Sequence, residues 1–101
     1  MRVTASSGVV DKATTFDFNQ AGDVVSARYC GGSIVDGFLL GRLASDVSLR
    51  FRYIQLDVGG NLDCGVSNAS ISRSPDGRLV LVEDYQFLTR PDAGRNTLEE
   101  I

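Results

Sequence analysis

The sequence predicts an all-β protein: an eight-stranded antiparallel up-and-down meander that closes into a barrel. Three observations lead to this prediction. Apolar and polar residues alternate over short runs, turn-forming residues separate the runs, and no helical spacing of apolar residues persists along the chain. Side chains of a strand alternate between its two faces, so each run fits a strand with one buried face. The same pattern leaves a β-sandwich of two sheets as the alternative fold.

Glycine-containing turns set the number of strands. The clearest turn is Ser74–Gly77, with proline at the second position and glycine at the fourth. Similar segments occur at residues 21–23, 30–33, 58–61 and 91–94, where glycine, proline, Asp or Asn favour a turn. We therefore expect strands at residues 2–7, 13–20, 24–29, 34–43, 47–57, 62–73, 78–88 and 95–101.

The period of two also predicts which side chains face the interior. The run 13–20 contains the alternating segment Thr15–Asn19, and the run 47–57 alternates apolar residues with Ser48, Arg50 and Arg52. On this parity the interior of four strands is lined by Phe16, Val25, Ala27, Tyr29, Leu49, Phe51, Tyr53, Leu81, Tyr85 and Phe87. The run 62–73 adds Gly65, Ser67, Ala69 and Ile71.

The two ends of the chain are expected to close the sheet. Residues 95–101 are compatible with a helical turn or a strand, and the strand is favoured because it can pair with residues 2–7. Closure removes the two exposed edges that an open meander would leave. Eight strands also form about the smallest barrel with room inside for side chains or one small ligand. We expect a single barrel domain over residues 1–101.

Polar residues on the interior parity are the candidate ligand-binding groups. Glu83 falls between Leu81 and Tyr85 on the inward face, where an ionised carboxylate is costly unless it is paired, hydrogen-bonded or wet. Glu83 therefore either anchors a small polar ligand or belongs to an internal hydrogen-bond network. Tyrosine hydroxyls or an arginine at the rim are the expected partners. The candidate ligand-binding residues are Tyr29, Tyr53, Ser67, Glu83 and Tyr85, while Asn96 is a weaker candidate.

Composition excludes several other functions. The chain has 101 residues, a net charge of −3 and no histidine. The sequence has no cluster of basic residues of the kind that would indicate nucleic-acid binding. The lack of histidine argues against Ser-His-Asp catalysis and, together with the lack of a CxxC pair, against a metal site. We predict no cofactor, and we expect Cys30 and Cys64 to be free thiols. No apolar run suits a membrane span or a signal peptide, so a cytoplasmic location is expected.

Two strands carry apolar residues on both faces. In residues 34–43, Phe38 and Leu40 alternate with the inward set, and in residues 78–88, Val80 and Val82 lie opposite Leu81. A strand of a small monomeric barrel needs only one apolar face. We therefore predict that a second copy covers the outer face, in a homodimer or higher homo-oligomer.

The chain also resembles a known group of small bacterial proteins. The resemblance lies in residues 27–37, Phe51–Tyr53, Asp76–Arg78, the spacing of Glu83, Tyr85 and Phe87, and Glu99–Ile101. This group is similar to avidin-like barrels, which share the up-and-down closure of lipocalins, and its members are often named N-acetylglutamate synthase. The resemblance thus implies an avidin-like barrel and, by that name, an N-acetyltransferase. The chain differs from the group's pattern by having Tyr85 and Phe87 where tryptophans are typical.

The residues themselves favour binding over catalysis. An acetyltransferase of the usual kind holds the pyrophosphate of acetyl-CoA at a glycine-rich loop that opens a helix, and the sequence shows no such segment. The leading hypothesis is a non-enzymatic module that binds a small polar ligand inside the barrel. A second hypothesis is an assembly protein with a solid interior, and an acetyltransferase is the third.

Overall fold

The computed structural model describes residues 1–101, and it contains eight strands and no helix. The strands are β1 Arg2–Ser6, β2 Thr15–Ala21, β3 Val24–Gly31, β4 Ile34–Ser45, β5 Ser48–Asp57, β6 Leu62–Arg73, β7 Leu79–Phe87 and β8 Ala93–Glu99. No helix in the structure is therefore long and apolar enough to cross a membrane.

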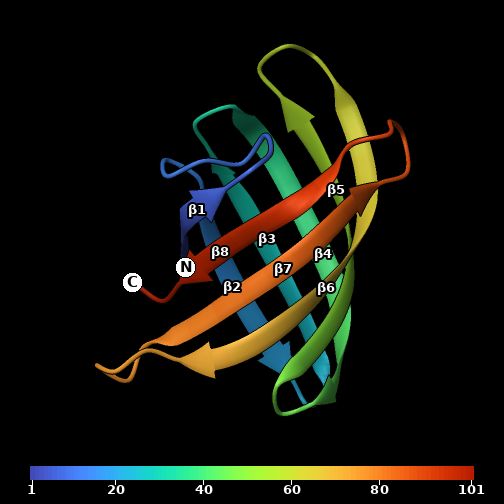
Figure 1. Cartoon of the computed structure of the whole chain (residues 1–101). Coiled ribbons are helices and arrows are strands. Elements are labelled where there is room, and N and C mark those ends of the chain that lie inside the picture. The colour runs from blue at the N-terminus through green and yellow to red at the C-terminus, as the bar shows by residue number, and fades with distance from the viewer.

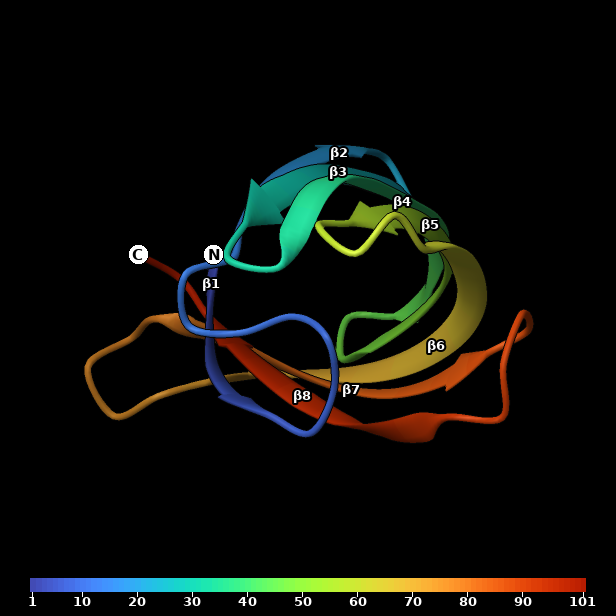
Figure 2. The same ribbon diagram turned by 90° about the horizontal axis from the view of Figure 1, so that it is seen from above.

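Each strand pairs antiparallel with the next, and β1 also pairs with β8, so the sheet closes into a barrel. Figure 1 shows the strands wrapped around one axis, and the view from above in Figure 2 shows the ring that they form. The predicted eight-stranded meander barrel is confirmed, and the alternative β-sandwich is not what the chain forms. Both ends of the described chain lie side by side, because Arg2 pairs with Glu99.

Each predicted turn lies between two strands, although strands extend into three of the predicted segments: Ala21 ends β2, Gly31 ends β3 and Ala93 begins β8. Gly77 has a φ of 86°, and its amide donates to Ser74 O at 2.9 Å, which closes the predicted Ser74–Gly77 turn. The segment 91–94 was predicted as a turn, but Ala93 and Gly94 lie in β8. Gly94 pairs with Tyr85, and the absence of a Cβ there makes room for the tyrosine ring.

The interior is filled as the period of two predicts. All ten side chains assigned to the interior of four strands are buried, and so are Gly65, Ser67 and Ala69 of β6. Ile71 is only partly buried, because it lies near the end of β6, where the barrel opens to solvent. Apolar burial on this one face is the main force that holds the sheet closed.

The seam between β1 and β2 is the thinnest part of the barrel wall. Only one residue pair, Arg2 with Thr15, joins the two strands in register. Met1 and Phe16 add two backbone hydrogen bonds of 2.7 Å each. Residues 7–14, which connect β1 to β2, pass across the end of the barrel in the view from above. The structure therefore has one end covered by a loop whose flanking strands are weakly paired.

Candidate functional site

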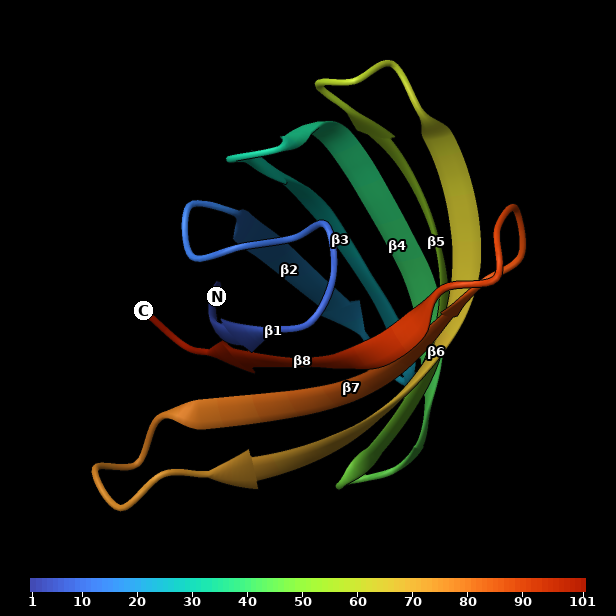
Figure 3. The same cartoon turned by 45° about the horizontal axis from the view of Figure 1, so that its top comes forward.

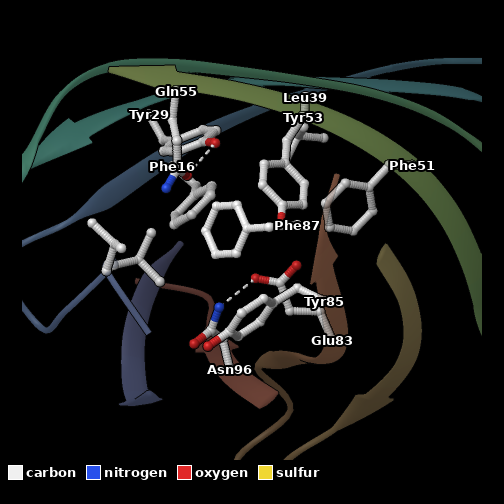
Figure 4. Close-up of a pocket in the computed structure, with 12 residues that line it drawn as sticks. Phe16, Tyr29, Leu39, Phe51, Tyr53, Gln55, Glu83, Tyr85, Phe87 and Asn96 are labelled. Carbon is white, nitrogen blue, oxygen red and sulfur yellow. Dashed lines mark hydrogen bonds between the residues drawn. The ribbon is translucent and has the colours of Figure 1, made fainter. Parts of the chain in front are cut away.

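The candidate site is a small cavity inside the barrel, lined by aromatic rings and a few polar side chains. Its volume is about 20 Å³, enough for roughly one water molecule. Figure 4 shows the side chains around it, which come from opposite walls of the barrel and from the loop 7–14. The lining residues are Val9, Val10, Phe16, Tyr29, Leu39, Phe51, Tyr53, Gln55, Glu83, Tyr85, Phe87 and Asn96.

Each of the three interior tyrosines lies opposite a glycine on the neighbouring strand. Tyr29 pairs with Gly37, Tyr53 with Gly65, and Tyr85 with Gly94. A Cβ on Gly37 would come within 2.4 Å of the Tyr29 ring, and one on Gly65 would come within 2.3 Å of the Tyr53 hydroxyl. The rings therefore lie against bare backbone, an arrangement that anchors large aromatic groups on the wall of a small barrel.

Glu83 lies at the centre of the polar part of the cavity and is only 6% exposed. Its Oε1 accepts a hydrogen bond of 2.8 Å from Asn96 Nδ2, and Asn96 Oδ1 accepts one of 2.9 Å from Ser6 Oγ. Burial raises the pKa of Glu83, and the Asn96 hydrogen bond opposes this only in part. Glu83 is thus a carboxyl group without a cationic partner in the barrel interior.

The Ser6 hydroxyl connects this network to the loop over the barrel end. The carbonyl of Val10, 2.5 Å from Ser6 Oγ, shares the single hydroxyl proton with Asn96 Oδ1, and Ser6 Oγ accepts from the amide of Gly8 at 3.1 Å. One chain of contacts therefore runs from the buried carboxyl group of Glu83 to the loop 7–14.

The three tyrosine hydroxyls have different environments, which corrects one expectation. They were predicted as partners of Glu83, and none of them forms a hydrogen bond with it. Tyr29 donates to Gln55 Oε1 at 2.9 Å, and the Tyr85 hydroxyl lies 3.3 Å from Ser7 Oγ. The Tyr53 hydroxyl is buried and has no partner. The glycine pairing explains this result, because it fixes the direction of each ring and so the point that its hydroxyl reaches.

Ser67 and the rim arginine complete the site. The Ser67 hydroxyl is buried close to Glu83 and helps to stabilise its charged form, but its geometry is not that of a hydrogen bond. The expected arginine is Arg90, whose guanidinium group lies 4.1 Å from the centre of the Phe87 ring. Its ion pairs are with Asp92 at 3.0 Å and Asp63 at 3.6 Å, so it does not pair with Glu83.

All five candidate residues are buried in the barrel interior, and Tyr29, Tyr53, Glu83 and Tyr85 line the same cavity. Ser67 lies beside it on β6 and does not line it. Gln55, Asn96 and Ser7 are the polar residues with which the candidates form hydrogen bonds. Gln55 follows Tyr53 by two residues in β5 and therefore faces inward as well. Extending the predicted alternation to the next inward position would have identified it.

The closed meander and its aromatic-lined interior define a class of small up-and-down barrels with an internal site. A family model described as "Avidin-like protein" matches residues 1–101. The chain therefore belongs to the avidin-like family. Searches of the curated proteins and of the solved structures found no match.

Proposed function

We propose that this protein is a non-enzymatic module that binds a small polar molecule in the interior of its barrel. One observation carries the proposal. Three buried polar groups, the Tyr53 hydroxyl, the Ser67 hydroxyl and the carboxyl group of Glu83, have unused hydrogen-bonding capacity in the same aromatic-lined interior. Buried polar atoms in native proteins are rarely left unpartnered, and exceptions call for an explanation such as a ligand. Membership of the avidin-like family supports the same conclusion.

A ligand larger than water must enter past the loop 7–14. Val9 and Val10 of this loop form part of the cavity wall. The loop leads into the weakly paired β1–β2 seam, where opening breaks few backbone hydrogen bonds. Displacement of the two valines would widen the opening between the cavity and solvent without disturbing the other strand pairs.

A thermal-shift screen of small polar metabolites against the wild type and Glu83→Gln tests the proposal. A ligand at about 100 times its Kd adds about 2.7 kcal/mol to stability. We expect at least one metabolite to stabilise the wild type and to have much less effect on Glu83→Gln. Glu99→Gln removes the same charge from a residue outside the cavity and is the matched control. If no metabolite distinguishes Glu83→Gln from the control, the proposal is wrong.

The name carried by similar proteins supplies an alternative, N-acetylglutamate synthase. Acetyl transfer from acetyl-CoA to glutamate, measured on the purified protein and lost in Glu83→Gln, would favour this enzyme over the binding module. The cytoplasmic location inferred from the sequence also stays a prediction, which fractionation of cells that express the protein would test.

We also propose that the barrel forms a homodimer through the outer face of β4 and β5. Phe38, Leu40 and Ile54 are 43%, 53% and 49% exposed, and Phe38 lies directly opposite Ile54. Contiguous apolar groups of this kind on an outer face mark an interaction surface. The outer side chains of β7 are less available, because Val80 and Val82 are half-buried. Of the two strands predicted from the sequence, β4 is therefore the better candidate, and the structure adds Ile54 of β5 to its outer face.

Charge along this face determines how two copies would pack. Asp36, which pairs with Arg28 at 2.7 Å, lies at one end of the outer face of β4. Arg42, which pairs with Asp23 at 3.0 Å, lies opposite Arg50 at the other end. A two-fold axis parallel to the strands would bring the arginines of both copies together. An axis perpendicular to the strands brings Asp36 of one copy toward the arginines of the other. We infer the second arrangement, because it replaces repulsion by attraction.

Light scattering after size exclusion tests the dimer. The wild type is expected at twice the chain mass, and Phe38→Asp at the mass of one chain with its β-sheet spectrum kept. Val47→Asp is the matched control, because Val47 is 60% exposed in the β4–β5 turn, outside the proposed face. A monomeric wild type, or equal dissociation by both variants, would contradict the proposed interface.

A further inference from the structure

The cavity is acidic and has no internal counter-ion. Glu83 is the only charged side chain among the residues that line it. The groups that could neutralise Glu83 from the surrounding strands are hydroxyl and amide groups, and none of them is a cation. Arg90, at the rim, already pairs with Asp63 and Asp92. Any ligand that fills the cavity must therefore lie beside an uncompensated carboxyl group.

Aromatic rings line the cavity around this carboxyl group, and Arg90 already lies over the ring of one of them, Phe87. Six rings line the cavity, and they are arranged in stacked and edge-on pairs: Phe16 stacks on Tyr29 with centroids 4.5 Å apart, and Tyr53 meets Phe87 edge-on at 5.6 Å. The face of an aromatic ring carries partial negative charge and attracts a cation within about 6 Å. Rings and carboxyl group thus favour the same sign of ligand charge.

We propose that the interior site binds the ammonium group of a small organic amine. This inference rests on the proposed function, the binding of a small polar molecule in the barrel. The Glu83 oxygen that does not bond to Asn96 would accept one N–H, and the Tyr53 hydroxyl oxygen would accept another. The cavity of about 20 Å³ admits a group of the size of one ammonium head. The rest of the amine would extend past Val9 and Val10, where the loop 7–14 opens.

Other ligand classes fit the site less well. A carboxylate or phosphate would face the like charge of Glu83 and the electron-rich ring faces. A neutral amide can use the hydrogen bonds, but it gains no electrostatic attraction to the aromatic rings or to the carboxyl group. An ammonium group satisfies both the hydrogen-bonding capacity and the charge of the site.

Binding of an ammonium group should be coupled to release of the carboxyl proton. Without ligand, burial favours protonated Glu83, since the groups that face it are Tyr53 of β5, Ser67 of β6 and Asn96 of β8. Asp84, the next residue on β7, also raises the pKa of Glu83 through its charge. Tyr29 and Tyr53 interact with Glu83 from across the barrel, and burial raises their pKa values, so both stay neutral. The bound ammonium cation takes the place of the proton, which goes to solvent. Amine affinity should accordingly rise with pH, up to tenfold per pH unit, until Glu83 is ionised or the amine loses its own proton.

Titrations monitored by nuclear magnetic resonance test this inference, with the Asn96 side-chain amide as the reporter. The probes are methylammonium, butylammonium, acetamide and acetate. We expect the two amines to shift the Asn96 signal in the wild type and in Glu99→Gln, with acetate inactive. Glu83→Gln should weaken amine binding at least tenfold and remove its pH dependence. The pH dependence in the wild type serves as an independent measurement should Glu83→Gln fold poorly.

The possible outcomes separate this inference from the proposed function. If acetamide or acetate shifts the Asn96 signal and the amines do not, the ligand class is wrong but an interior binding site is supported. The ligand class is also wrong if amines bind Glu83→Gln as tightly as the wild type. If no probe shifts the signal and no metabolite stabilises the protein, both proposals fail.

Discussion

Tyr29 and Tyr53 are the same residue type on neighbouring walls of one cavity, yet their hydroxyl groups contribute differently to stability. The Tyr29 hydroxyl donates to the buried Gln55, whereas the Tyr53 hydroxyl has no partner. Tyr29→Phe leaves Gln55 Oε1 unpaired and should cost about 1–2 kcal/mol, while Tyr53→Phe should be nearly neutral or slightly stabilising. Urea unfolding of both variants measures the difference.

The same two variants also show whether the Tyr53 hydroxyl contributes to stability or to ligand binding. If Tyr53→Phe costs as much as Tyr29→Phe, its hydroxyl has a partner in solution, for example a fixed water molecule, and is not a free ligand-binding group. If Tyr53→Phe keeps full stability but binds amines more weakly, the hydroxyl serves the ligand and not the fold.

The carboxyl group of Glu83 should make stability depend on pH in an unusual direction. Its pKa in the folded state is raised above the ordinary value of 4.5, so the folded state holds the proton more tightly than the unfolded state. This stabilisation is complete below the unfolded pKa and is lost as pH rises through the folded pKa. We expect the wild type to lose stability relative to Glu83→Gln as pH rises above about 4.5.

Thermal unfolding of the two proteins between pH 4 and pH 8 is the measurement, with Glu99→Gln as the control for a lost charge. A wild type that gains stability over Glu83→Gln on going to higher pH would mean that Glu83 is paired with a cation in solution. The contacts of the carboxyl group derived above would then be incomplete.

At the scale of the strands, the pairing of aromatic residues with glycines controls how the interior is filled. Gly37→Ala would place a Cβ 2.4 Å from the Tyr29 ring, so the ring must move and lose its hydrogen bond to Gln55. Overpacking of this kind typically costs about 1–3 kcal/mol. Gly59→Ala is the control, because its Cβ would meet no atom closer than 3.2 Å. Chemical denaturation should show a loss for the first variant well beyond that of the second.

The strands and their inward faces could be predicted from the sequence because both depend on the alternation of residue types within a single strand. Alternation placed Leu49, Phe51 and Tyr53 on one face, and closure followed from the need to cover two edges. The register between two strands depends on both of them, so it cannot be predicted from the residue pattern of one strand. The pairing of Gly94 with Tyr85 was therefore missed, and the end of the preceding turn was misplaced.

The contacts of the site were harder to predict for the same reason. That Glu83 is buried follows from parity, but its partner Asn96 is known only once β7 and β8 are aligned, since the two residues are directly opposite. Cavity volume depends further on the rotamers of six rings. The sequence thus predicted that Tyr29, Tyr53, Glu83 and Tyr85 face the interior, while their hydrogen bonds and the space between them required the structure.

At the scale of the whole molecule, closure means that the β8–β1 junction is a strand pair like the others, except that no turn joins it. Val3 pairs with Leu98, and each is 1% exposed, so the core runs unbroken across this junction. Connection of residues 101 and 1 by a short Gly-Ser linker should therefore leave the barrel intact. The position where the chain is opened instead should decide whether the protein still folds.

A circular permutant opened between Asp76 and Gly77 is expected to fold with a loss of no more than about 2 kcal/mol. The β6–β7 turn extends away from the barrel in Figure 3, and exposed turns of this kind tolerate new termini. Opening between Arg50 and Phe51 divides β5, where Phe51 pairs with both Gly41 and Ser67, and should prevent folding. Circular dichroism and urea unfolding of both permutants provide the test. The linker must be long enough to join residues 101 and 1 without strain. If the turn-opened permutant is then still unfolded, the β8–β1 pairing does not hold the barrel closed.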